Sequence, residues 1–515
     1  MKLNYKRIIL VGFAFFLIQA FWQAYDNTIP MILTNKFGMS QAWSGAIMAL
    51  DNVLALFMLP LFGAISDKHH SKWGRRTPFI VVGTLIAAVM LIALSFVDNA
   101  QLKNLQDVSA IDDPAALSVI YEEEKAATLL TPSGEKFILG QKFTEEEFTA
   151  IRSQITDGDS AVTNPDYTNY VMPARQACAW DATAKSPVTL VFFIALLLVI
   201  LVSMAVFRSP AVALMPDVTL KPLRSKANAV INLMGSAGGI LVLVLGMVFA
   251  TSAVRNSLMS YTGYFAVIAA IMLAALVVFM LTVRENEWAA EMQQQSVELG
   301  LEDKEEAATG ERKLSVDEVK SLIFLLLSIV LWFFGYNAVT SKYSVYASNI
   351  LHKDYNLTLI IAQAAAIISY LPVGFIASKV GRKKTILAGV VMLTAAFTTA
   401  SFMSAESPTM LMNAMFCLAG IGWATINVNS FPMVVEMCSG SDVGRYTGFY
   451  YTASMAAQVV TPMFSGFLMD KLGMTVLFPY AAIFVAGAFV TMLFVRHGDS
   501  RPIPAKGLEA LDVDD

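Results

Sequence analysis

The sequence has little charge, little cysteine and little histidine, and each shortage excludes a class of protein. Of the 515 residues, 15% are charged and 56% are hydrophobic, whereas a soluble domain carries about 25% charged residues. Three cysteines provide no disulfide framework. There is no Gly-x4-Gly-Lys-Ser/Thr phosphate loop and no recognisable catalytic constellation. We therefore expect neither an ATP-driven pump nor an enzyme, and neither a cofactor nor a metal site.

Long apolar runs are what the chain has in abundance. An α-helix needs about 20 apolar residues to cross a bilayer. The first run could be a cleaved signal peptide, but it looks too long and no small-x-small cleavage site stands out. We predict an all-α integral membrane protein whose twelve spanning helices lie near residues 8–30, 42–66, 77–98, 188–214, 227–251, 262–283, 319–347, 357–378, 385–403, 408–434, 445–469 and 474–496.

Lysine and arginine gather in alternate loops between these helices. Short loops rich in these residues stay on the cytoplasmic side, so we predict a multi-pass protein of the cell membrane with both termini in the cytoplasm. The loops after predicted helices 2, 4, 8, 10 and 12 carry Lys68, Lys72, Arg75, Arg76, Lys221, Arg224, Lys226, Lys379, Arg382, Lys383, Lys384, Arg445 and Arg496.

Two long polar stretches divide the chain. The acidic stretch contains "TPSGEKFILG", typical of a hairpin, and "TEEEFTAIRSQI", typical of a capped helix. It is either a small folded cap or a loop without a role in transport. The predicted parts are helices 1–3 in 1–98, an external insertion at 99–187, helices 4–6 in 188–283, a cytoplasmic linker at 284–318, a six-helix bundle at 319–496 and a cytoplasmic tail at 497–515.

The two halves repeat each other in their loops. "GAISDKHHSKWGRR" after helix 2 matches "GFIASKVGRKK" after helix 8. "MPDVTLKPLRSKAN" after helix 4 matches "VVEMCSGSDVGRYTG" after helix 10, each with a carboxylate at the helix end and an arginine beyond it. Two matched pairs at the same offset are much harder to obtain by chance than one.

Two six-helix halves with these loops resemble the major facilitator superfamily. The resemblance implies two pseudo-twofold bundles that rock around a central site, with loop charges that latch the outward-facing state and separate as the cytoplasmic side opens. Setting topology alone is the other interpretation of these charges. In the second loop, Ser378 occupies the position at which the motif has Asp, which implies a weaker latch. The implied gating residues are Asp67, Lys72, Arg75, Arg76, Asp217, Arg224, Arg382, Lys383, Glu436 and Arg445.

A narrower resemblance is carried by the longer loop "SDKHHSKWGRRTPFI". With "FRSPAVALMPD", "LWFFGYNAVTSKYSVYA" and "VGRYTGFYYTASMAAQVVTPMFSGFLMD", it looks like the plant sucrose carriers, their animal proton-sugar relatives and the melibiose-permease type of glycoside-cation symporter. The melibiose branch carries acids in helix 2 where this chain has Ala55 and Leu59. A sodium site needs several oxygen ligands, so their absence favours protons.

Polar residues at helical spacing lie on the helices that line the cavity in this superfamily. Such groups in a membrane face a water-filled cavity by default, although a single amide can instead bond a neighbouring helix. Amides and carboxylates suit a polyhydroxylated ligand, and an aromatic ring can stack on a pyranose. The predicted substrate-binding residues are Gln19, Trp22, Gln23, Asn27, Asn52, Arg208, Asn232, Tyr336, Asn337, Lys342, Trp423, Asn427, Tyr451 and Gln458.

Coupling requires a group that changes charge, and all four histidines lie in loops or tails. Burial favours the protonated form of a carboxyl group and a nearby cation opposes it. We predict that one of Asp51 and Asp26 binds the proton and that the other binds substrate. Lys342 either snorkels outward or faces the cavity, where it would fit an anionic sugar.

The favoured function is proton-coupled symport of a sugar or glycoside by rocker-switch alternating access. An exporter of drugs, nucleosides or other small solutes is the main alternative, and a membrane sensor that uses the insertion is a further one. The expected partners are the substrate, protons and the lipid bilayer. We expect a monomer and no nucleic acid.

Overall fold

The computed structural model describes residues 3–157, 160–220, 223–298, 315–435, 437 and 443–498. Eleven of the twelve predicted segments each coincide with one α-helix and the second coincides with two, so the predicted all-α membrane architecture is confirmed. Nine helical spans among the described residues are long and apolar enough to cross a membrane. The second predicted helix is interrupted at Ala49 and consists of two parts, α2 and α3.

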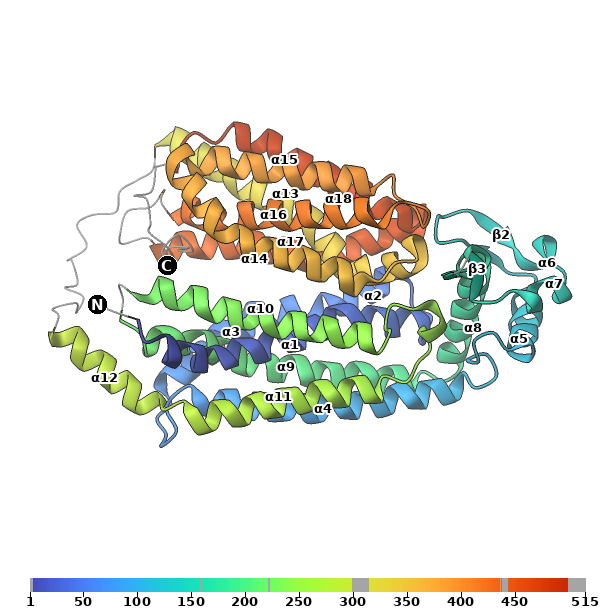
Figure 1. Cartoon of the computed structure of the whole chain (residues 1–515), viewed down its shortest axis with the longest axis horizontal. Coiled ribbons are helices and arrows are strands. Elements are labelled where there is room, and N and C mark those ends of the chain that lie inside the picture. The colour runs from blue at the N-terminus through green and yellow to red at the C-terminus, as the bar shows by residue number, and fades with distance from the viewer. Residues whose placement is uncertain are drawn as a thin grey trace.

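The first half of the chain forms an N-terminal bundle, drawn from blue to light green in Figure 1. Within it α1 packs on α10 and α11, and α9 packs on α3 and α4. Its elements are α1 (Tyr5–Asn35), α2 (Gln41–Met48), α3 (Leu50–Lys68), α4 (Thr77–Asn104), α9 (Val188–Asp217), α10 (Arg224–Val248), η3 (Val254–Asn256) and α11 (Thr262–Thr282).

The second half forms a C-terminal bundle that lies beside the first, and the linker helix α12 (Glu285–Glu298) projects beyond the bundles at the end where the N-terminus lies (Figure 1). Within this bundle α13 packs on α17 and α18, and α16 packs on α14 and α15. Its elements are α13 (Val316–Tyr346), η4 (Ala347–Leu351), α14 (Tyr355–Val380), α15 (Arg382–Ala400), α16 (Thr409–Val435), α17 (Val443–Leu472), η5 (Met474–Val476) and α18 (Leu477–Leu493).

The insertion between α4 and α9 folds as a separate unit with its own apolar core around Leu117, Phe148 and Tyr167. The predicted hairpin is present as β1 and β2, and the predicted capped helix as α7, whose Thr144 and Glu147 form a capping box. A second hairpin, β3 and β4, was not predicted. The elements are α5 (Pro114–Glu124), β1 (Thr128–Leu130), β2 (Lys136–Ile138), α6 (Leu139–Lys142), α7 (Glu145–Ala150), β3 (Gln154–Asp157), β4 (Ser160–Thr163), η1 (Tyr167–Val171) and α8 (Met172–Lys185).

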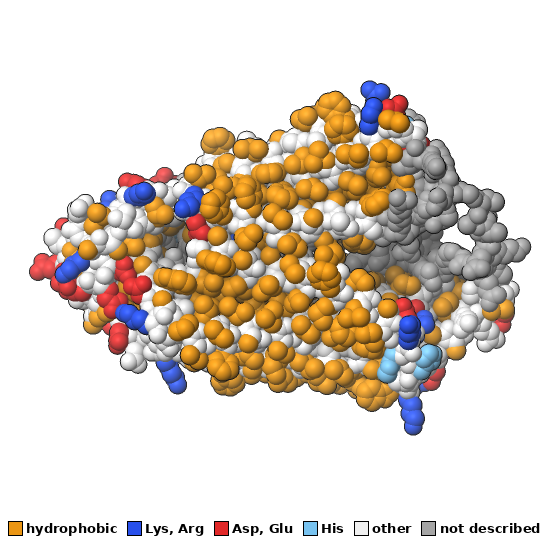
Figure 2. Space-filling model, turned by 180° about the vertical axis from the view of Figure 1, so that it is seen from behind, with side chains coloured by type: hydrophobic (Ala, Val, Ile, Leu, Met, Phe, Trp, Pro, Cys, Tyr) orange, Lys and Arg blue, Asp and Glu red, His pale blue; other side chains and the backbone are white. Residues whose placement is uncertain are grey.

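An apolar belt surrounds the bundles. Phe57, Val248 and Leu281 are 68%, 73% and 79% exposed, which burial in lipid explains and water does not. On the face drawn in Figure 2, hydrophobic side chains cover the middle of the molecule and charged ones gather at its two ends. We call these the insertion end, from which 105–187 projects, and the terminal end, where α1 and α13 begin.

Candidate functional site: a cavity between two bundles

A cavity of about 620 Å³ lies between the two bundles, within the range of about 300–1,000 Å³ that small-molecule pockets have. Helices α1, α2, α3, α9 and α10 form one wall, and α13, α16 and α17 form the other. Its lining residues are Gln19, Trp22, Asp26, Met48, Asp51, Asn52, Ala55, Arg208, Val212, Asn228, Phe333, Asn337, Thr340, Ser341, Asn427, Phe431, Tyr450, Tyr451, Ser454, Met455, Gln458 and Pro462.

Two carboxylates enter the cavity from neighbouring helices of the N-terminal bundle. Asp26 follows Gln19 and Trp22 on one face of α1, at intervals of three and four residues that bring side chains to the same side of a helix. Asp51 lies in the first turn of α3, directly after the interruption at Ala49, and its Oδ1 accepts a 2.8 Å hydrogen bond from Asn52 Nδ2. A carboxylate is favoured there because the N-terminus of a helix is electropositive.

Arg208 of α9 provides the positive charge of the cavity. Its guanidinium carbon lies 5.7 Å from the centre of the Trp22 ring, which is cation–π distance. It interacts electrostatically with both Asp51 and Asp26. Two partly buried carboxylates therefore interact with one guanidinium.

Two hydrogen-bond donors of the cavity lining have no partner. The Trp22 Nε1–H and the Asn337 Nδ2–H groups are buried and bond nothing among the described residues. A buried donor without a partner is costly, on the order of 1–3 kcal/mol. These donors, one from each bundle, are therefore available to a ligand or to water.

The cavity is closed toward the insertion end by contacts between the bundles. Asp470 of α17 accepts the N–H groups of Gln41 and Ala42 at 2.7 and 2.8 Å, and these belong to the first turn of α2. Lys342 of α13 donates to the Gln41 carbonyl at 2.7 Å. The free N–H groups at the start of α2 are thus capped by a carboxylate from the opposite bundle.

Glycines allow this close approach. A Cβ atom on Gly45 would lie 2.0 Å from the Pro462 carbonyl oxygen, and one on Gly466 would lie 2.2 Å from the Gln41 carbonyl oxygen. A further contact joins the turn after α10 to the first residue of α14, where Thr251 Oγ1 and Tyr355 Oη lie 2.7 Å apart. The insertion end is consequently held together by both packing and hydrogen bonds.

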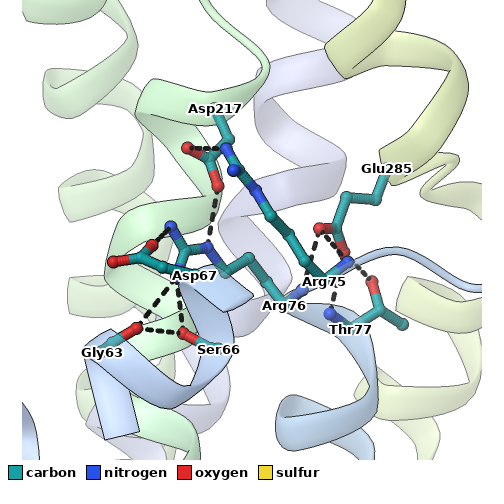
Figure 3. A network of polar contacts seen from close by, with 8 residues as sticks. All are labelled: Gly63, Ser66, Asp67, Arg75, Arg76, Thr77, Asp217 and Glu285. Atoms are coloured by element: carbon teal, nitrogen blue, oxygen red, sulfur yellow. Dashed lines mark hydrogen bonds and ion pairs between the residues drawn. The ribbon is translucent and has the colours of Figure 1, made fainter. Parts of the chain in front are cut away.

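A second polar network lies at the terminal end, around the loop between α3 and α4 (Figure 3). Arg76 is 4% exposed and donates from Nε to Asp217 at 2.8 Å, while its other nitrogens reach Asp67 and Ser66. Arg75 pairs with Asp217 at 2.9 Å. Burial acts to lower the pKa of Arg76, but the hydrogen bonds and charges of Asp217 and Asp67 raise it above its ordinary value.

Glu285 at the start of α12 completes this network (Figure 3). Its carboxylate accepts the backbone N–H groups of Arg75, Arg76 and Thr77 at 2.7–2.8 Å and so caps the N-terminus of α4. Gly74 has φ +118°, and a Cβ there would lie 2.1 Å from the carboxylate. The glycine of the loop motif is therefore required by the linker carboxylate beside it.

Comparisons with known proteins agree with this architecture. A model of the Major Facilitator Superfamily matches residues 176–369 and 349–511, more than half of the chain. The chain belongs to this superfamily. A model described as MFS/sugar transport protein matches residues 10–103. This superfamily member is a multi-pass membrane transporter of small molecules and not an enzyme.

Individual relatives are distant from this transporter. Sucrose transport proteins SUC3 and SUC4 of Arabidopsis thaliana are 39% and 36% identical to it over 67 and 59 residues. These matches span only 11% and 12% of the relatives' own length.

Similar solved structures show its fold. The inward-open xylose transporter XylE from E. coli has a TM-score of 0.58 with 15% identity, over 99% of both chains. The nucleoside transporter NupG has a TM-score of 0.55 with 14% identity, over 95% of this chain and all of that one.

Many of the predicted site residues line the cavity of this superfamily member. They come from six different helices, and their convergence follows from the bundle packing. They are Gln19, Trp22, Asp26, Asp51, Asn52, Arg208, Asn337, Asn427, Tyr451 and Gln458.

Other predicted residues lie outside the cavity lining, where their polar groups bond their own helix or a neighbouring one. Gln23 accepts a 2.9 Å hydrogen bond from Gln363 of the opposite bundle. Asn27 bonds the Gln23 carbonyl of its own helix, and Asn232, which is exposed, bonds Asn228.

Three further residues differ from their predicted roles. Tyr336 and Trp423 stack on each other with ring centres 3.6 Å apart instead of presenting free faces to a sugar. Lys342 is fully buried at the insertion end, where it neither snorkels nor lines the cavity.

Sequence reasoning did not assign the aromatic and methionine part of the lining, including Phe333, Phe431, Tyr450 and Met455. These residues were indistinguishable from lipid-facing or core residues in an apolar run. Their spacing from polar lining residues was the available signal: Phe333 lies one turn before Asn337, and Phe431 one turn after Asn427.

The gating predictions divide between the two loops. Asp67, Arg75, Arg76 and Asp217 are brought together, while Lys72 is an exposed neighbour whose carbonyl accepts from Asn286. The network is formed in this structure, in which the insertion end is closed. The reason is that its described partners all belong to the N-terminal bundle and α12, so closing the insertion end does not separate them.

In the second loop Arg382 is buried, and Lys383 donates to the carbonyls of Leu493 and Val495. Glu436 and the side chains of Arg224, Ser378 and Arg445 lie outside the described part of the structure.

Proposed function

We propose that this superfamily member couples the movement of a proton to the movement of a sugar or glycoside. The observation that carries the proposal is the convergence of Asp26, Asp51 and Arg208 with unpartnered donors in one cavity between the bundles. A coupled transporter needs a titratable group and a substrate site that are exposed together to one side of the membrane at a time.

The chemistry of the lining favours a polyhydroxylated substrate. Asn337 and Trp22 offer donors, and the Asp51 carboxylate offers acceptors to hydroxyl groups. Phe333 and Tyr450 add apolar ring surface against which a sugar ring can pack. Lys342 lies outside this lining, so Arg208 is the cation that an anionic substituent would meet.

We assign the proton to Asp26 and the substrate contact to Asp51. Asn52 and the N-terminus of α3 stabilise the anionic form of Asp51, whereas Asp26 accepts no hydrogen bond among the described residues. When Asp26 binds a proton, the cavity contains one carboxylate and one guanidinium, and its charges balance. The electrostatic cost of moving the site from one side of the membrane to the other is then lower.

The test is uptake of radiolabelled sugars into proteoliposomes with and without an imposed pH gradient. Asp26→Asn is expected to abolish accumulation while exchange of internal for external sugar continues, and Asp51→Asn is expected to reduce both. Asp107→Asn in the exposed part of the insertion is the matched control. Full accumulation by the Asp26→Asn and Asp51→Asn forms would exclude the proposal.

Nucleoside transport is the second candidate. Phe333, Phe431 and Tyr450 give the lining three aromatic rings on which a nucleobase could stack, and NupG shares the fold. Competition of unlabelled nucleosides against the labelled sugar separates the two functions, because the better ligand displaces the other at lower concentration.

We further infer that the insertion faces the outside of the cell. Arg75 and Arg76 bond Glu285 of α12, and Glu291 of the same helix pairs with Arg7 near the first described residues. Lys383, next to Arg382, donates to the Val495 carbonyl near the last described residues. These basic side chains therefore lie at the terminal end, and such charges are retained in the cytoplasm. Protease added to intact cells is then expected to cleave a site engineered after Glu146 but not one engineered after Glu298.

A further inference from the structure

The insertion touches both bundles. It belongs mechanically to the N-terminal bundle, because its two ends continue into α4 and α9. Gln176 of α8 donates to Asn35 Oδ1 at 2.9 Å. Gly38, with φ +64°, lies so close to α8 that a Cβ atom would be 2.3 Å from the Trp180 nitrogen. The insertion and the N-terminal bundle are therefore expected to move together.

Two contacts join the insertion to the C-terminal bundle. The Met474 N–H group donates to the Pro132 carbonyl at 2.6 Å. Thr168 Oγ1 lies 3.3 Å from His352 Nε2. Both contact points on the C-terminal bundle are turns at the insertion end, one between η4 and α14 and one between α17 and η5. We call this pair the bridge contacts.

The first bridge contact is a close backbone approach. Gly134 and Gly473 have φ +92° and +90°, and a Cβ on Gly473 would lie 2.4 Å from the backbone of Ser133. Two glycines in left-handed conformations at one contact allow the turns to touch. The contact therefore depends on the backbone conformation of these two turns, although it involves few residues.

Beneath the bridge the surfaces do not pack tightly. A hollow of about 360 Å³ lies between the insertion, the turn before α2 and the end of α17, with Trp43, Trp180 and Asp470 in its walls. The bridge therefore crosses above a hollow instead of lying on a tightly packed interface.

We propose that the insertion is a releasable strap that holds the insertion end closed. Opening that end requires Asp470 and Lys342 to leave α2, and it moves the C-terminal bundle away from the N-terminal bundle. Because the insertion stays with the N-terminal bundle, both bridge contacts must break in the same step. The strap therefore biases the transporter toward the state that is closed at this end. This inference rests on alternating access but not on the substrate or the coupling ion.

The test uses a probe cysteine in the cavity, Ser341→Cys, in a chain whose three native cysteines are replaced. A membrane-impermeant maleimide is added separately to each side of the membrane. Thr168→Val removes the hydroxyl of the second bridge contact, together with its bond to the Pro165 carbonyl inside the insertion. It is expected to raise labelling from the insertion side about two- to twelvefold, the effect of losing one ordinary hydrogen bond between the insertion and the C-terminal bundle. Thr149→Val is the matched control, because the Thr149 hydroxyl bonds only within α7.

A crosslink gives the opposite perturbation. Thr168→Cys with His352→Cys, joined by a short thiol crosslinker or a disulfide, is expected to abolish labelling from the insertion side. Labelling from the terminal side should persist, and reduction of a disulfide should restore the original rates. Labelling from the insertion side that continues at the uncrosslinked rate, or loss of labelling from both sides, overturns the proposal. Neither readout needs a substrate or a pH gradient, so failure here is distinct from failure of the proposed function.

Discussion

The two ends of the molecule use the same device for different purposes. At the insertion end Asp470 caps α2, and at the terminal end Glu285 caps α4. Each is a carboxylate that satisfies the free N–H groups of an N-terminal-bundle helix from outside that bundle. Asp470 belongs to the opposite bundle, so its cap breaks when the bundles part. Glu285 belongs to the linker, so its cap survives that movement.

The two ends also contribute differently to the stability of the protein and to the population of its states. The charges at the terminal end, centred on Arg76, stabilise one bundle and anchor the linker to it. If the bundles alternate as proposed, the contacts at the insertion end are present in one state of the transporter and absent from the other. Substitutions at the terminal end should therefore change the stability of the protein, and those at the insertion end should change the population of its states.

The largest effect is expected for Arg76→Ala. Loss of this buried guanidinium leaves Asp217 without its closest partner, and removing one member of a buried ion pair costs about 3–5 kcal/mol. Thermal unfolding of the purified full chain should show a marked decrease in midpoint. Arg75→Ala, at a residue that is 43% exposed in its pair with Asp217, should change stability by only about 0–1 kcal/mol. Equal effects of the two substitutions would contradict the assignment of Arg76 as the centre.

Gly45→Ala should act on the states and not on the stability. The added methyl group meets the Pro462 carbonyl and prevents α2 from approaching α17. Overpacking of this kind costs about 1–3 kcal/mol, and here it destabilises the state in which the insertion end is closed. We expect faster labelling of a cavity cysteine from the insertion side and a large loss of transport. Gly487→Ala is the control, because its nearest neighbour is 3.7 Å away. An unchanged labelling rate would show that the bundles do not need this contact.

Glu285→Gln should have a moderate effect at the terminal end. The amide can accept fewer of the bonds made by the carboxylate, and bonds to a charged group are stronger than neutral ones by about 1 kcal/mol. The unfolding midpoint should fall while the accessibility of the cavity stays the same. Glu287→Gln, at an exposed neighbour, should leave both unchanged. Altered accessibility in Glu285→Gln would mean that the linker also controls the states.

The smallest effect concerns the pH dependence of the insertion. Burial, together with the nearby charge of Asp181, raises the pKa of the Glu124 carboxyl above its usual range. The folded insertion therefore holds this proton more tightly than the unfolded chain does. Its stability should decrease as pH rises from the ordinary carboxyl pKa through the raised one. The protection of α5 and α8 against hydrogen exchange, after correction for the intrinsic base-catalysed rate, should be lower at the higher pH, and Glu124→Gln should remove this loss of protection.

Local sequence patterns were sufficient for the helices and for part of the site. Long apolar runs placed all twelve helices, because a bilayer imposes a minimum length on each of them. The spacing of Gln19, Trp22 and Asp26 placed one face of α1 against the cavity. The hairpin predicted from "TPSGEKFILG" and the capped helix predicted from "TEEEFTAIRSQI" are both present, because turn and capping preferences act within a few residues.

Local sequence patterns could not predict which residues the buried polar and aromatic side chains contact. Nothing near Gln23 in the sequence indicates that Gln363 will bond it, and nothing near Tyr336 indicates that Trp423 will cover its face. Lys342 was expected either to snorkel outward or to face the cavity, but its ammonium group donates to a backbone carbonyl of the opposite bundle. Each of these contacts joins residues far apart in the chain.

The sequence by itself therefore determined the membrane spans, the repeat of the two halves and the charged loops, because hydrophobic length and local charge act along the chain. Only the tertiary structure decided which polar groups reach the cavity and which close the insertion end. It also decided that a linker carboxylate lies against Gly74. Those outcomes depend on how two bundles and an insertion pack against one another, and a buried polar group bonds whichever partner that packing brings within reach.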